Sequence, residues 1–419
     1  MSSFNNSDID LLVLTWHQTY LSSFAGGYIR LREFFQYMPR KLRFLVLDNA
    51  PSIYKDILHK KNIRTYQTTK VIKPLMKRIF FLWFVLENIS AAFVIYRHAK
   101  KLIQKRGVKV VYVPIGEFFH LYIPAILLKK KHPYLKLVVD ILNYELPGNS
   151  YSNYFRILTK AGTNPIIAIG ILLHYAIITT VMNATIRSID YMFTVSPDLV
   201  KKIKRVYQKS TIDYTPSGIN LSDVVKKDTK KIFDAVYVGR VTVRKGIFEV
   251  LNVWKNVVSQ KPNARLAIAG HTSEMVMKQL KKTIEQYGIK KNVTIFGVVS
   301  NKKKFEILSQ SEIFLHLAPY EPLFPVIGIL EGLAAGLPVV IYDMPVVKSQ
   351  KKELHDIPCI MIVENGNTSQ AVDTIADYLA SNIKNKQMVT KQARTYAKRF
   401  DWKVIARKEL DIIEGLINN

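Results

Sequence analysis

The feature that most constrains the fold is the segment PYEPLFPVIGILEGLAAGLPVV, which covers residues 319–340. A run of apolar residues typical of a buried strand, residues 313–317, comes directly before it. Residues 327–335 are predicted to form a helix. The following Gly-Leu-Pro ends it, because glycine suits a left-handed cap and proline cannot continue the turn. Another apolar run, residues 339–341, begins the next strand. The segment therefore predicts a strand, loop, helix and strand of a parallel α/β sheet.

Two carboxylates flank the place in this unit where a ligand is expected. Glu321 follows the first strand, and Glu331 lies on the predicted helix. In open α/β sheets, ligands bind at the carboxyl ends of strands and at the amino ends of helices. A single glutamate on a loop or helix is usually just solvated, but this position makes both glutamates candidate ligand contacts.

The segment resembles the signature of retaining glycosyltransferases of the GT-B fold, the large fourth family in particular. The residues that match its second half are Glu331, Gly336, Pro338, Val339 and Val340. The first half departs from the family signature in two ways. Its spacing differs, with nine residues between Glu321 and Glu331, and residues 322–325 stand where the family has Gly-Phe-Gly. The resemblance implies that Glu331 holds the nucleotide ribose and Glu321 the sugar hydroxyls, with Gly328 in the same donor site.

A basic loop is predicted to bind the phosphates of the donor. The loop, GRVTVRKG, lies between a predicted strand at residues 233–238 and a predicted helix at residues 247–258. Cations beside the free N–H groups of a helix N-terminus form an anion site. The glycosyltransferase family has Gly-Arg, a short gap and Lys-Gly here. The resemblance therefore assigns Gly239, Arg240 and Lys245 to the donor pyrophosphate, with the two cations stabilising the leaving nucleoside diphosphate.

Three further places are predicted to contribute to the donor site. Gly26 and Gly27 stand between the first predicted strand and the first predicted helix, where glycine lets the backbone approach a phosphate. A glycine there also has purely steric uses. The resemblance places Ser196 at the end of the last strand of the first domain, and Gly297 beside the nucleotide base.

Two residues of the first domain are candidates for binding the acceptor. His120 lies in a loop after the strand predicted at residues 108–114, and Asp140 ends the strand at residues 137–140. Each could touch a sugar or orient an acceptor hydroxyl, and Asp140 is also a candidate catalytic residue. The alternatives are a helix-capping histidine and a strand-end aspartate bonded to nearby backbone.

The resemblance implies an α/β protein of the GT-B fold, with two Rossmann-like domains facing across a cleft. Residues 1–220 would form the acceptor domain and residues 221–395 the nucleotide-sugar domain. Residues 396–419 would form a C-terminal helix that returns to the first domain. A chain of 419 residues is long enough for two such cores.

The charge and the cysteine content limit which classes of partner and which compartment are expected. Lys and Arg outnumber Asp and Glu by 61 to 32, a formal charge of +29, which favours polyanions. No zinc-finger, helix-turn-helix or arginine–aromatic RNA motif is present, so an anionic membrane surface is expected rather than nucleic acid. One cysteine rules out an internal disulfide, and the first residues lack a secretion signal. A cytoplasmic protein, associated peripherally with a membrane, is therefore expected.

The most apolar stretch, residues 166–182, allows three interpretations. It could be a core helix of the first domain, an interfacial helix that dips into a membrane, or a transmembrane helix. The core helix is favoured slightly over the interfacial one. A span is least favoured, because it would split a domain whose strands continue beyond it.

The reaction implied by the resemblance moves a sugar from a nucleotide diphosphate sugar to an acceptor hydroxyl, with retention at the anomeric carbon. The acceptor would be a glycan or a lipid-linked molecule. Basic residues would replace a metal, so no cofactor is expected. Two alternatives remain open. Glu321 and Glu331 could serve a glycoside hydrolase as acid and nucleophile, or the chain could be an inactive scaffold that binds anionic lipid or another polyanion.

Overall fold

The chain divides into two compact units. Unit 1 comprises Met1–Pro216 and Trp402–Asn419, and unit 2 comprises Ser217–Asp401. The computed structural model describes residues 8–16, 26–49, 54, 56–59, 62–65, 80–116, 118–142, 150–160, 163–195, 197–207, 211–224, 229–321, 324–354 and 356–418. The chain thus passes between the units after residue 216 and after residue 401, near the boundaries predicted at residues 220 and 396.

Unit 1 is built on one sheet of seven parallel strands in the order β3-β2-β1-β4-β5-β6-β7. The strands are β1 (Leu11–Leu14), β2 (Phe44–Asp48), β3 (Ile63–Thr65), β4 (Val110–Val113), β5 (Lys136–Ile141), β6 (Tyr191–Thr194) and β7 (Ile212–Tyr214). Most of them are buried on both faces, as expected for a parallel sheet covered by helices. The order reverses direction between β1 and β4, which is the topological switch point where doubly wound sheets bind ligands.

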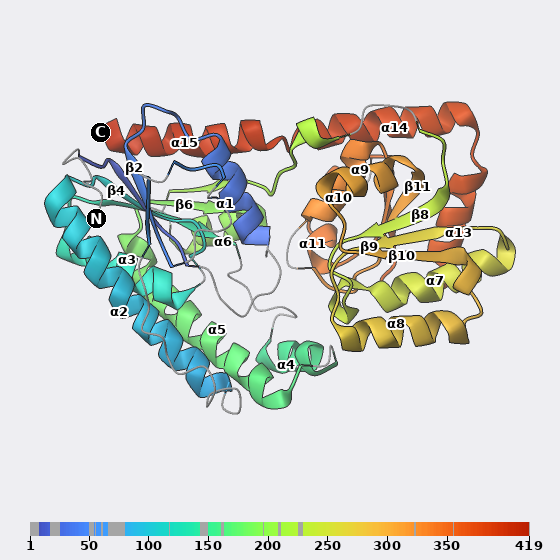
Figure 1. The fold of residues 1–419 in the computed structure, drawn as a ribbon, viewed down its shortest axis with the longest axis horizontal. Helices are drawn as coiled ribbons and strands as arrows, with labels where there is room; N and C mark the ends of the chain where they lie inside the picture. Colours follow the sequence, from blue (N-terminus) through green and yellow to red (C-terminus); the bar gives the residue numbers. More distant parts are fainter. Residues whose placement is uncertain are drawn as a thin grey trace. The chain divides into compact units, whose positions relative to one another are not determined.

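The helices of unit 1 surround this sheet, with one exception (Figure 1). They are α1 (Gly26–Gln36), α2 (Phe80–Arg106), α3 (Phe119–Lys131), α4 (Tyr151–Lys160), α5 (Pro165–Thr185), η4 (Ile186–Ser188), α6 (Pro197–Val206) and α15 (Trp402–Asn418). The exception is α4, which lies away from the sheet beside α5. The last helix belongs to the same core as the strands, because Leu410, Ile413 and Ile417 are buried among strand residues. The end of the chain is therefore a structural part of unit 1.

Helix α5 is not the core helix that its composition favoured. Only Ala168, Gly170, Ile178 and Met182 of this helix are buried. Of the described helices, α5 with its following turn, Pro165–Ser188, is the one long and apolar enough to cross a membrane by length and composition. Its last turns pack on the sheet, and its first half packs with α4 in a separate small cluster. The apolar sequence is thus only partly explained by packing inside unit 1.

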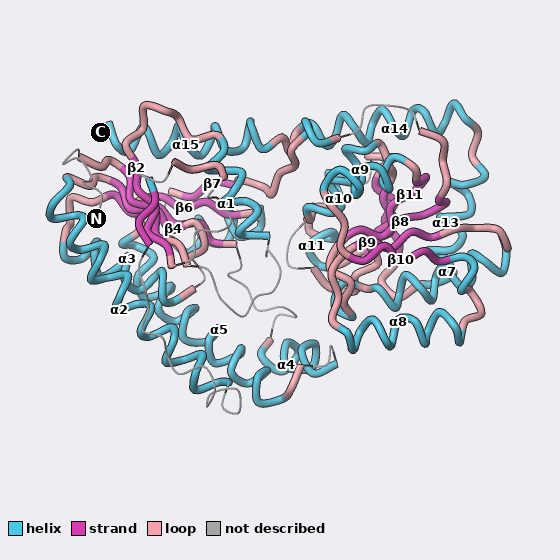
Figure 2. Tube along the Cα trace, viewed as in Figure 1, coloured by secondary structure: helices cyan, strands magenta, loops and turns pink. Residues whose placement is uncertain are grey.

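Unit 2 is built on a second sheet, whose six parallel strands follow the order β10-β9-β8-β11-β12-β13 (Figure 2). The strands are β8 (Phe233–Val238), β9 (Leu266–Ala269), β10 (Val293–Gly297), β11 (Ser311–His316), β12 (Val339–Tyr342) and β13 (Ile360–Val363). The helical segments are η5 (Leu221–Asp223), η6 (Val243–Lys245), α7 (Ile247–Gln260), α8 (Glu274–Gln286), η7 (Lys290–Asn292), α9 (Asn301–Ser309), α10 (Ile327–Ala335), α11 (Pro345–Lys348), α12 (Lys351–Leu354), α13 (Thr368–Ala380) and α14 (Ile383–Lys398). Here the order reverses between β8 and β11.

The organising segment folds as its sequence predicts. Helix α10 has the predicted bounds, and it ends at Gly336 in the left-handed conformation with φ of 91°. β12 follows directly and pairs with β11 in parallel. The acidic loop therefore lies at the carboxyl edge of the sheet, between two neighbouring strands.

Candidate functional site

The candidate site of unit 2 is formed by the loops that follow β8 and β11. These two strands pair in parallel, so their carboxyl ends lie next to each other at the point where the strand order reverses. The loop after β8 contains Arg240, Arg244 and Lys245, and the loop after β11 contains Glu321. The predicted donor-binding loop and the predicted acidic loop therefore lie at one switch point.

Gly246 allows the two loops to approach closely. It joins η6 to α7 with φ of 73°, a left-handed conformation that side chains rarely adopt. A Cβ atom at this position would lie 2.0 Å from the carbonyl oxygen of Leu317, just beyond β11. Thr242 caps η6 by accepting a hydrogen bond from the Lys245 backbone N–H at 3.3 Å. These contacts fix the backbone of Lys245 against the loop that contains Glu321.

Lys245 and Glu321 form a buried ion pair. The Nζ of Lys245 lies 2.5 Å from Oε1 of Glu321, and Nε2 of His316 lies 3.1 Å from the same oxygen. Burial raises the pKa of Glu321, but Lys245 and His316 outweigh this effect and lower it to about 2. Burial also lowers the pKa of Lys245, an effect that Glu321 opposes. Glu321 is therefore ionised, and it fixes the position of the Lys245 ammonium.

Arg240 and Arg244 add positive charge that no described carboxylate neutralises. Within the described part of the chain, neither guanidinium has a hydrogen bond or ion pair. Glu321 is matched by Lys245, so the loop has an excess of two positive charges. Helix α7 begins directly after Gly246, which provides no side-chain cap, so the first N–H groups of the helix are available to a ligand. Cations beside open helix N–H groups are suited to a diphosphate.

Glu331 lies in a second ion pair, on α10. Its Oε1 is 2.5 Å from Nζ of Lys304 on α9. Burial raises the pKa of Glu331, an effect that Lys304 opposes and Asp223 reinforces. The sequence did not single out Lys304, since it is one of three consecutive lysines with nothing to distinguish it. His316 was not predicted as a site residue, because in the sequence it looks like an ordinary residue of a buried strand.

The predicted donor-site glycines have backbone roles at the same sheet edge. A Cβ atom on Gly270 would lie only 1.7 Å from the carbonyl oxygen of Gly239. Gly297 ends β10 with φ of 66° and accepts a hydrogen bond from the Gly270 N–H at 2.7 Å. A Cβ on Gly328 would lie 2.9 Å from the carbonyl oxygen of Val238 at the end of β8. Gly328 is thus required for packing α10 on the sheet.

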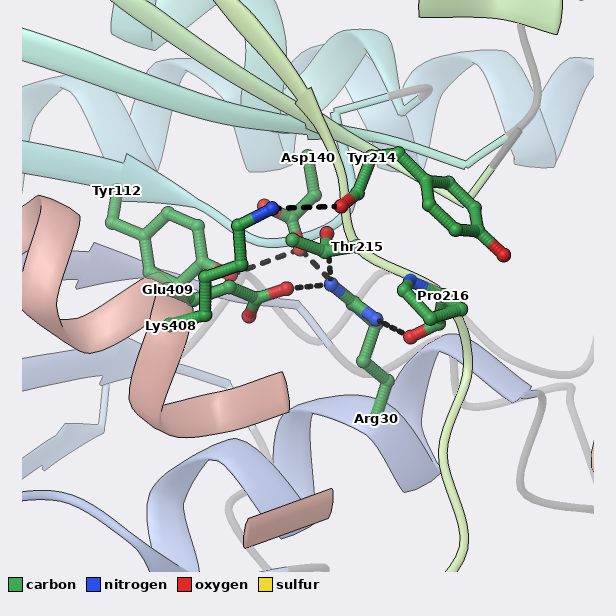
Figure 3. Close-up of polar contacts among 8 residues, drawn as sticks. All are labelled: Arg30, Tyr112, Asp140, Tyr214, Thr215, Pro216, Lys408 and Glu409. Atoms are coloured by element: carbon green, nitrogen blue, oxygen red, sulfur yellow. Dashed lines mark hydrogen bonds and ion pairs between the residues drawn. The ribbon is translucent and has the colours of Figure 1, made fainter. Parts of the chain in front are cut away.

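The structure places Asp140 in the interior of unit 1. Its side chain is 1% exposed, and Oδ2 accepts hydrogen bonds from Nε of Arg30 at 3.3 Å and from the Tyr112 hydroxyl at 2.9 Å (Figure 3). Burial raises the pKa of Asp140 to about 6, against the opposing effects of Arg30 and Tyr112. Asp140 is therefore part of an internal network, and its geometry gives no support to the predicted role in catalysis or acceptor binding.

Arg30 is the centre of that network. It donates hydrogen bonds to the Pro216 carbonyl at 2.8 Å and to the Thr215 hydroxyl at 2.7 Å, and it pairs with Glu409 of α15. Its guanidinium carbon lies 5.7 Å from the centre of the Trp402 ring. Arg30 thus contacts the residues at which the chain leaves unit 1 and returns to it. Figure 3 also shows Lys408 bonded to the carbonyl of Tyr214, next to these residues.

His120 is buried in an aromatic environment. It is the second residue of α3, so it is not the helix cap, which is Phe118. Its ring stacks on Phe118 and meets the edge of Trp16, with 5.4 Å between ring centres in both cases. Burial lowers the pKa of His120 to about 3, with a further effect from His174. Among described residues its ring nitrogens have no hydrogen-bond partner. This environment does not support the predicted contact with an acceptor.

The other predicted residues of unit 1 are only partly described. Gly26 and Gly27 are the first residues of α1, which follows β1 at the switch point of this sheet. Their predicted place at a helix N-terminus is confirmed. Ser196 lies outside the described residues, so its predicted role stays a prediction.

Comparisons with known proteins agree with this geometry. Residues 220–395 match the family described as glycosyl transferases group 1. Sucrose-phosphate synthase from Thermosynechococcus elongatus has a similar structure, with a TM-score of 0.70, 14% identity, and coverage of 98% of this chain and 99% of that chain. HepE from Anabaena, in complex with UDP and glucose, gives a TM-score of 0.66 at 12% identity, covering 97% of this chain and 99% of that chain. The fold and the site thus define a GT-B protein with two Rossmann-like domains.

The match to the glycosyl transferases group 1 family lies in the second domain. A curated relative from Xanthomonas oryzae pv. oryzae (strain PXO99A) is named GDP-mannose:cellobiosyl-diphosphopolyprenol alpha-mannosyltransferase. It is 26% identical over 177 residues, which cover 42% of this chain and 45% of that protein. A protein with the same name from Xanthomonas campestris is 24% identical over 178 residues. The chain therefore matches less than half the length of these relatives.

Proposed function

We propose that this protein is a glycosyltransferase that moves a sugar from a nucleotide diphosphate sugar to an acceptor hydroxyl, with retention of anomeric configuration. The observation that carries the proposal is the excess of positive charge at the switch point of unit 2. There Arg240, Arg244 and Lys245 adjoin the open N-terminus of α7. The family match of residues 220–395 supports the same assignment.

The chemical step breaks the bond between the anomeric carbon and the diphosphate oxygen of the donor. A new bond forms from that carbon to the acceptor oxygen, and the acceptor proton passes to the departing phosphate. Arg240 and Lys245 stabilise the charge that grows on the leaving group. Glu321 acts as a positioning residue, because its ion pair fixes Lys245. Glu331 holds ribose hydroxyls, for which a carboxylate is a good acceptor. These cations take the place of a metal, so the reaction proceeds without one.

The acceptor that we favour is lipid-linked. The curated relatives are named for a diphosphopolyprenol acceptor, and the +29 formal charge of this chain suits an anionic acceptor or surface. We therefore propose a peripheral enzyme at the cytoplasmic face of a membrane.

A glycoside hydrolase is a weaker candidate. Such an enzyme requires a carboxylic acid that is protonated near neutral pH. The pKa of Glu321 is lowered to about 2 by Lys245 and His316 despite the opposing effect of burial. Glu321 is therefore unsuited to act as the acid, and Glu331, whose pKa is raised by burial, is already paired with Lys304. A hydrolase would also have no use for the basic loop before α7. An inactive scaffold is the other candidate, and it would retain the basic loop without turnover.

The test is nucleotide release from candidate donors. The full chain is incubated with UDP-glucose or GDP-mannose in EDTA, with and without a polyprenol-diphosphate saccharide, and released UDP or GDP is measured. We expect release with one donor that increases with the acceptor and falls about a hundredfold in Arg240→Ala, since a charged hydrogen bond contributes about 1.5–3 kcal/mol. No release from any donor would refute the enzyme, and release only with a divalent metal would refute metal independence.

A further inference from the structure

We propose that the projecting ends of α2 and α5 dock the protein on an anionic lipid bilayer. The proposal concerns unit 1 and does not rest on the transferase reaction of unit 2. It starts from the exposed apolar side chains of these two helices, which packing inside unit 1 does not explain.

Exposed apolar residues are concentrated on α2 and α5. Seven of the sixteen large hydrophobic residues that are exposed in the described part of the chain lie on these two helices. They are Leu86, Ile89, Phe93, Ile166, Ile169, Leu173 and Ile177. Single exposed hydrophobic residues are common on any protein, but a concentration of this kind marks an interaction surface.

The residues on each helix form a stripe with helical spacing. On α5 the sequence intervals are three, four and four from Ile166 to Ile177, where the side chains are 48–69% exposed. On α2 they are three and four from Leu86 to Phe93, with exposures of 46–64%. Residues at such intervals lie on one face of a helix. Each helix therefore presents one continuous apolar face that unit 1 leaves uncovered.

Both stripes lie on the ends of the helices that extend beyond the sheet. In Figures 1 and 2 the two helices run side by side, and their first halves project from the sheet of unit 1, with α4 at the far end of α5. The last turns of both helices pack into the main core. At 1.5 Å per residue, the stripe of α5 is about 16 Å long, which is long enough to lie along the interface and too short to cross a hydrocarbon core of about 30 Å.

Positive charge follows the apolar stripes along each helix. The exposed face of α2 continues from Phe93 to Arg97 and Lys101, and the exposed face of α5 leads to Arg187 beyond its end. Residues 88–116 and 150–188 contain no Asp or Glu at all. Glu87 lies on α2 between Leu86 and Ile89, so these helices are predominantly rather than purely basic, and an apolar end with such a basic excess is complementary to a bilayer whose headgroups are anionic.

A complete membrane crossing by α5 does not fit the chain path. β5 precedes α4 and α5, β6 follows them, and these two strands pair in the same sheet. If α5 spanned the bilayer, α4 would have to lie on its far side, and the nine residues between Ile141 of β5 and Tyr151 of α4 would also have to cross about 30 Å of hydrocarbon, which only an almost fully extended chain could do. Shallow insertion of the helix ends satisfies both the apolar stripes and the sheet topology.

The test is sedimentation of the full chain with vesicles. The vesicles contain phosphatidylcholine alone or a 7:3 mixture with phosphatidylglycerol. We expect binding to the anionic vesicles that is about tenfold or more stronger than to the neutral ones, since each basic residue near the surface contributes to the attraction. Arg97→Glu/Lys101→Glu should weaken binding to the anionic vesicles and leave the weak binding to neutral vesicles unchanged.

A pair of matched triple variants separates this surface from general hydrophobicity. Ile169→Ser/Leu173→Ser/Ile177→Ser removes three exposed side chains of the stripe and should reduce vesicle binding about tenfold or more. The control, Met275→Ser/Ile383→Ser/Val404→Ser, removes three side chains that are at least as exposed on α8, α14 and α15, and it should bind vesicles like the wild type. Both variants should keep the thermal midpoint and the nucleotide affinity of the wild type.

Three results would overturn the proposal. The wild type could fail to bind anionic vesicles, or the stripe variant could bind them as well as the control does. The wild type could also be a dimer in light scattering that the stripe variant converts to a monomer, in which case a second copy covers the stripes. Nucleotide binding measured on the same samples reports on unit 2 separately, so failure here is distinct from failure of the proposed reaction.

Discussion

Replacing Arg30 with methionine should destabilise unit 1 strongly, and more at alkaline than at acidic pH. Arg30 is buried and is bonded to Asp140, Glu409, the Thr215 hydroxyl and the Pro216 carbonyl. Methionine preserves much of the side-chain volume but leaves two carboxylates, which are 1% and 2% exposed, without their cation. Breaking a buried ion pair by removing one partner costs about 3–5 kcal/mol.

The pH dependence follows from the pKa of Asp140. Burial raises this pKa to about 6, and Arg30 is the main group that opposes the rise, so in Arg30→Met it should rise further. A carboxyl whose pKa is raised by folding binds more protons in the folded than in the unfolded state, where its pKa is about 3.9. Its contribution to stability is therefore lost as the pH rises through the folded pKa. The loss of unfolding free energy in Arg30→Met, relative to the wild type, should therefore be smaller at pH 5 than at pH 8.

The assay is urea unfolding at pH 5 and pH 8, with hydrogen exchange of the β5 amides as a local readout for unit 1. Arg32→Met is the matched control, because Arg32 lies on the same helix and pairs with Asp56 on an exposed surface. An exposed pair of this kind contributes little, so the control should unfold like the wild type. Equal destabilisation of Arg30→Met at the two pH values, or equal behaviour of the two variants, would refute the reasoning.

Two further predictions concern unit 2. Gly246→Ala should destabilise this domain by about 1–3 kcal/mol and weaken nucleotide binding, because the new methyl group meets the carbonyl of Leu317 in a strained conformation. The control in thermal unfolding is Gly288→Ala, which has a φ of 69° and open space around it. This control should lose less stability. Lys304→Met should raise the pKa of Glu331 further, since Lys304 opposes the effect of burial. Nucleotide affinity should then fall at a higher pH in the variant than in the wild type as the solution is acidified. Calorimetry between pH 5.5 and 8.5 tests this, and parallel profiles would contradict it.

The sequence predicts unit 2 better than unit 1 because its signals there are local. Helix α10 and its glycine end follow from apolar spacing and cap chemistry, and the basic loop follows from Gly239, Arg240 and Lys245 standing between a strand and a helix. Such features are specified by neighbouring residues. The ion pair of Lys245 with Glu321 was not predicted, because it depends on the pairing of β8 with β11, which the sequence does not reveal.

The surroundings of Asp140 and His120 in unit 1 could not be predicted because they depend on partners far apart in the sequence. Asp140 ends a strand, as an active-site residue often does, but Arg30 and Glu409, which contact each other beside it, come from opposite ends of the chain. No local pattern reveals that network. His120 follows a strand at the switch point, and only the packing of Trp16 and Phe118 around it shows that it is buried. Lys304 was missed for the same reason, since its partner lies on another helix.

The most direct test of the account is calorimetry of UDP, GDP and ADP binding in EDTA. It compares the wild type with Arg240→Ala/Lys245→Ala and with Lys290→Ala/Lys291→Ala, which removes the same charge at the opposite edge of the same sheet. The account predicts that one diphosphate binds the wild type and the control alike. The site variant should lose about 3 kcal/mol or more, which is about a hundredfold or more in affinity. Equal affinity in all three proteins, or no binding to the wild type, would contradict the donor site at the switch point of unit 2.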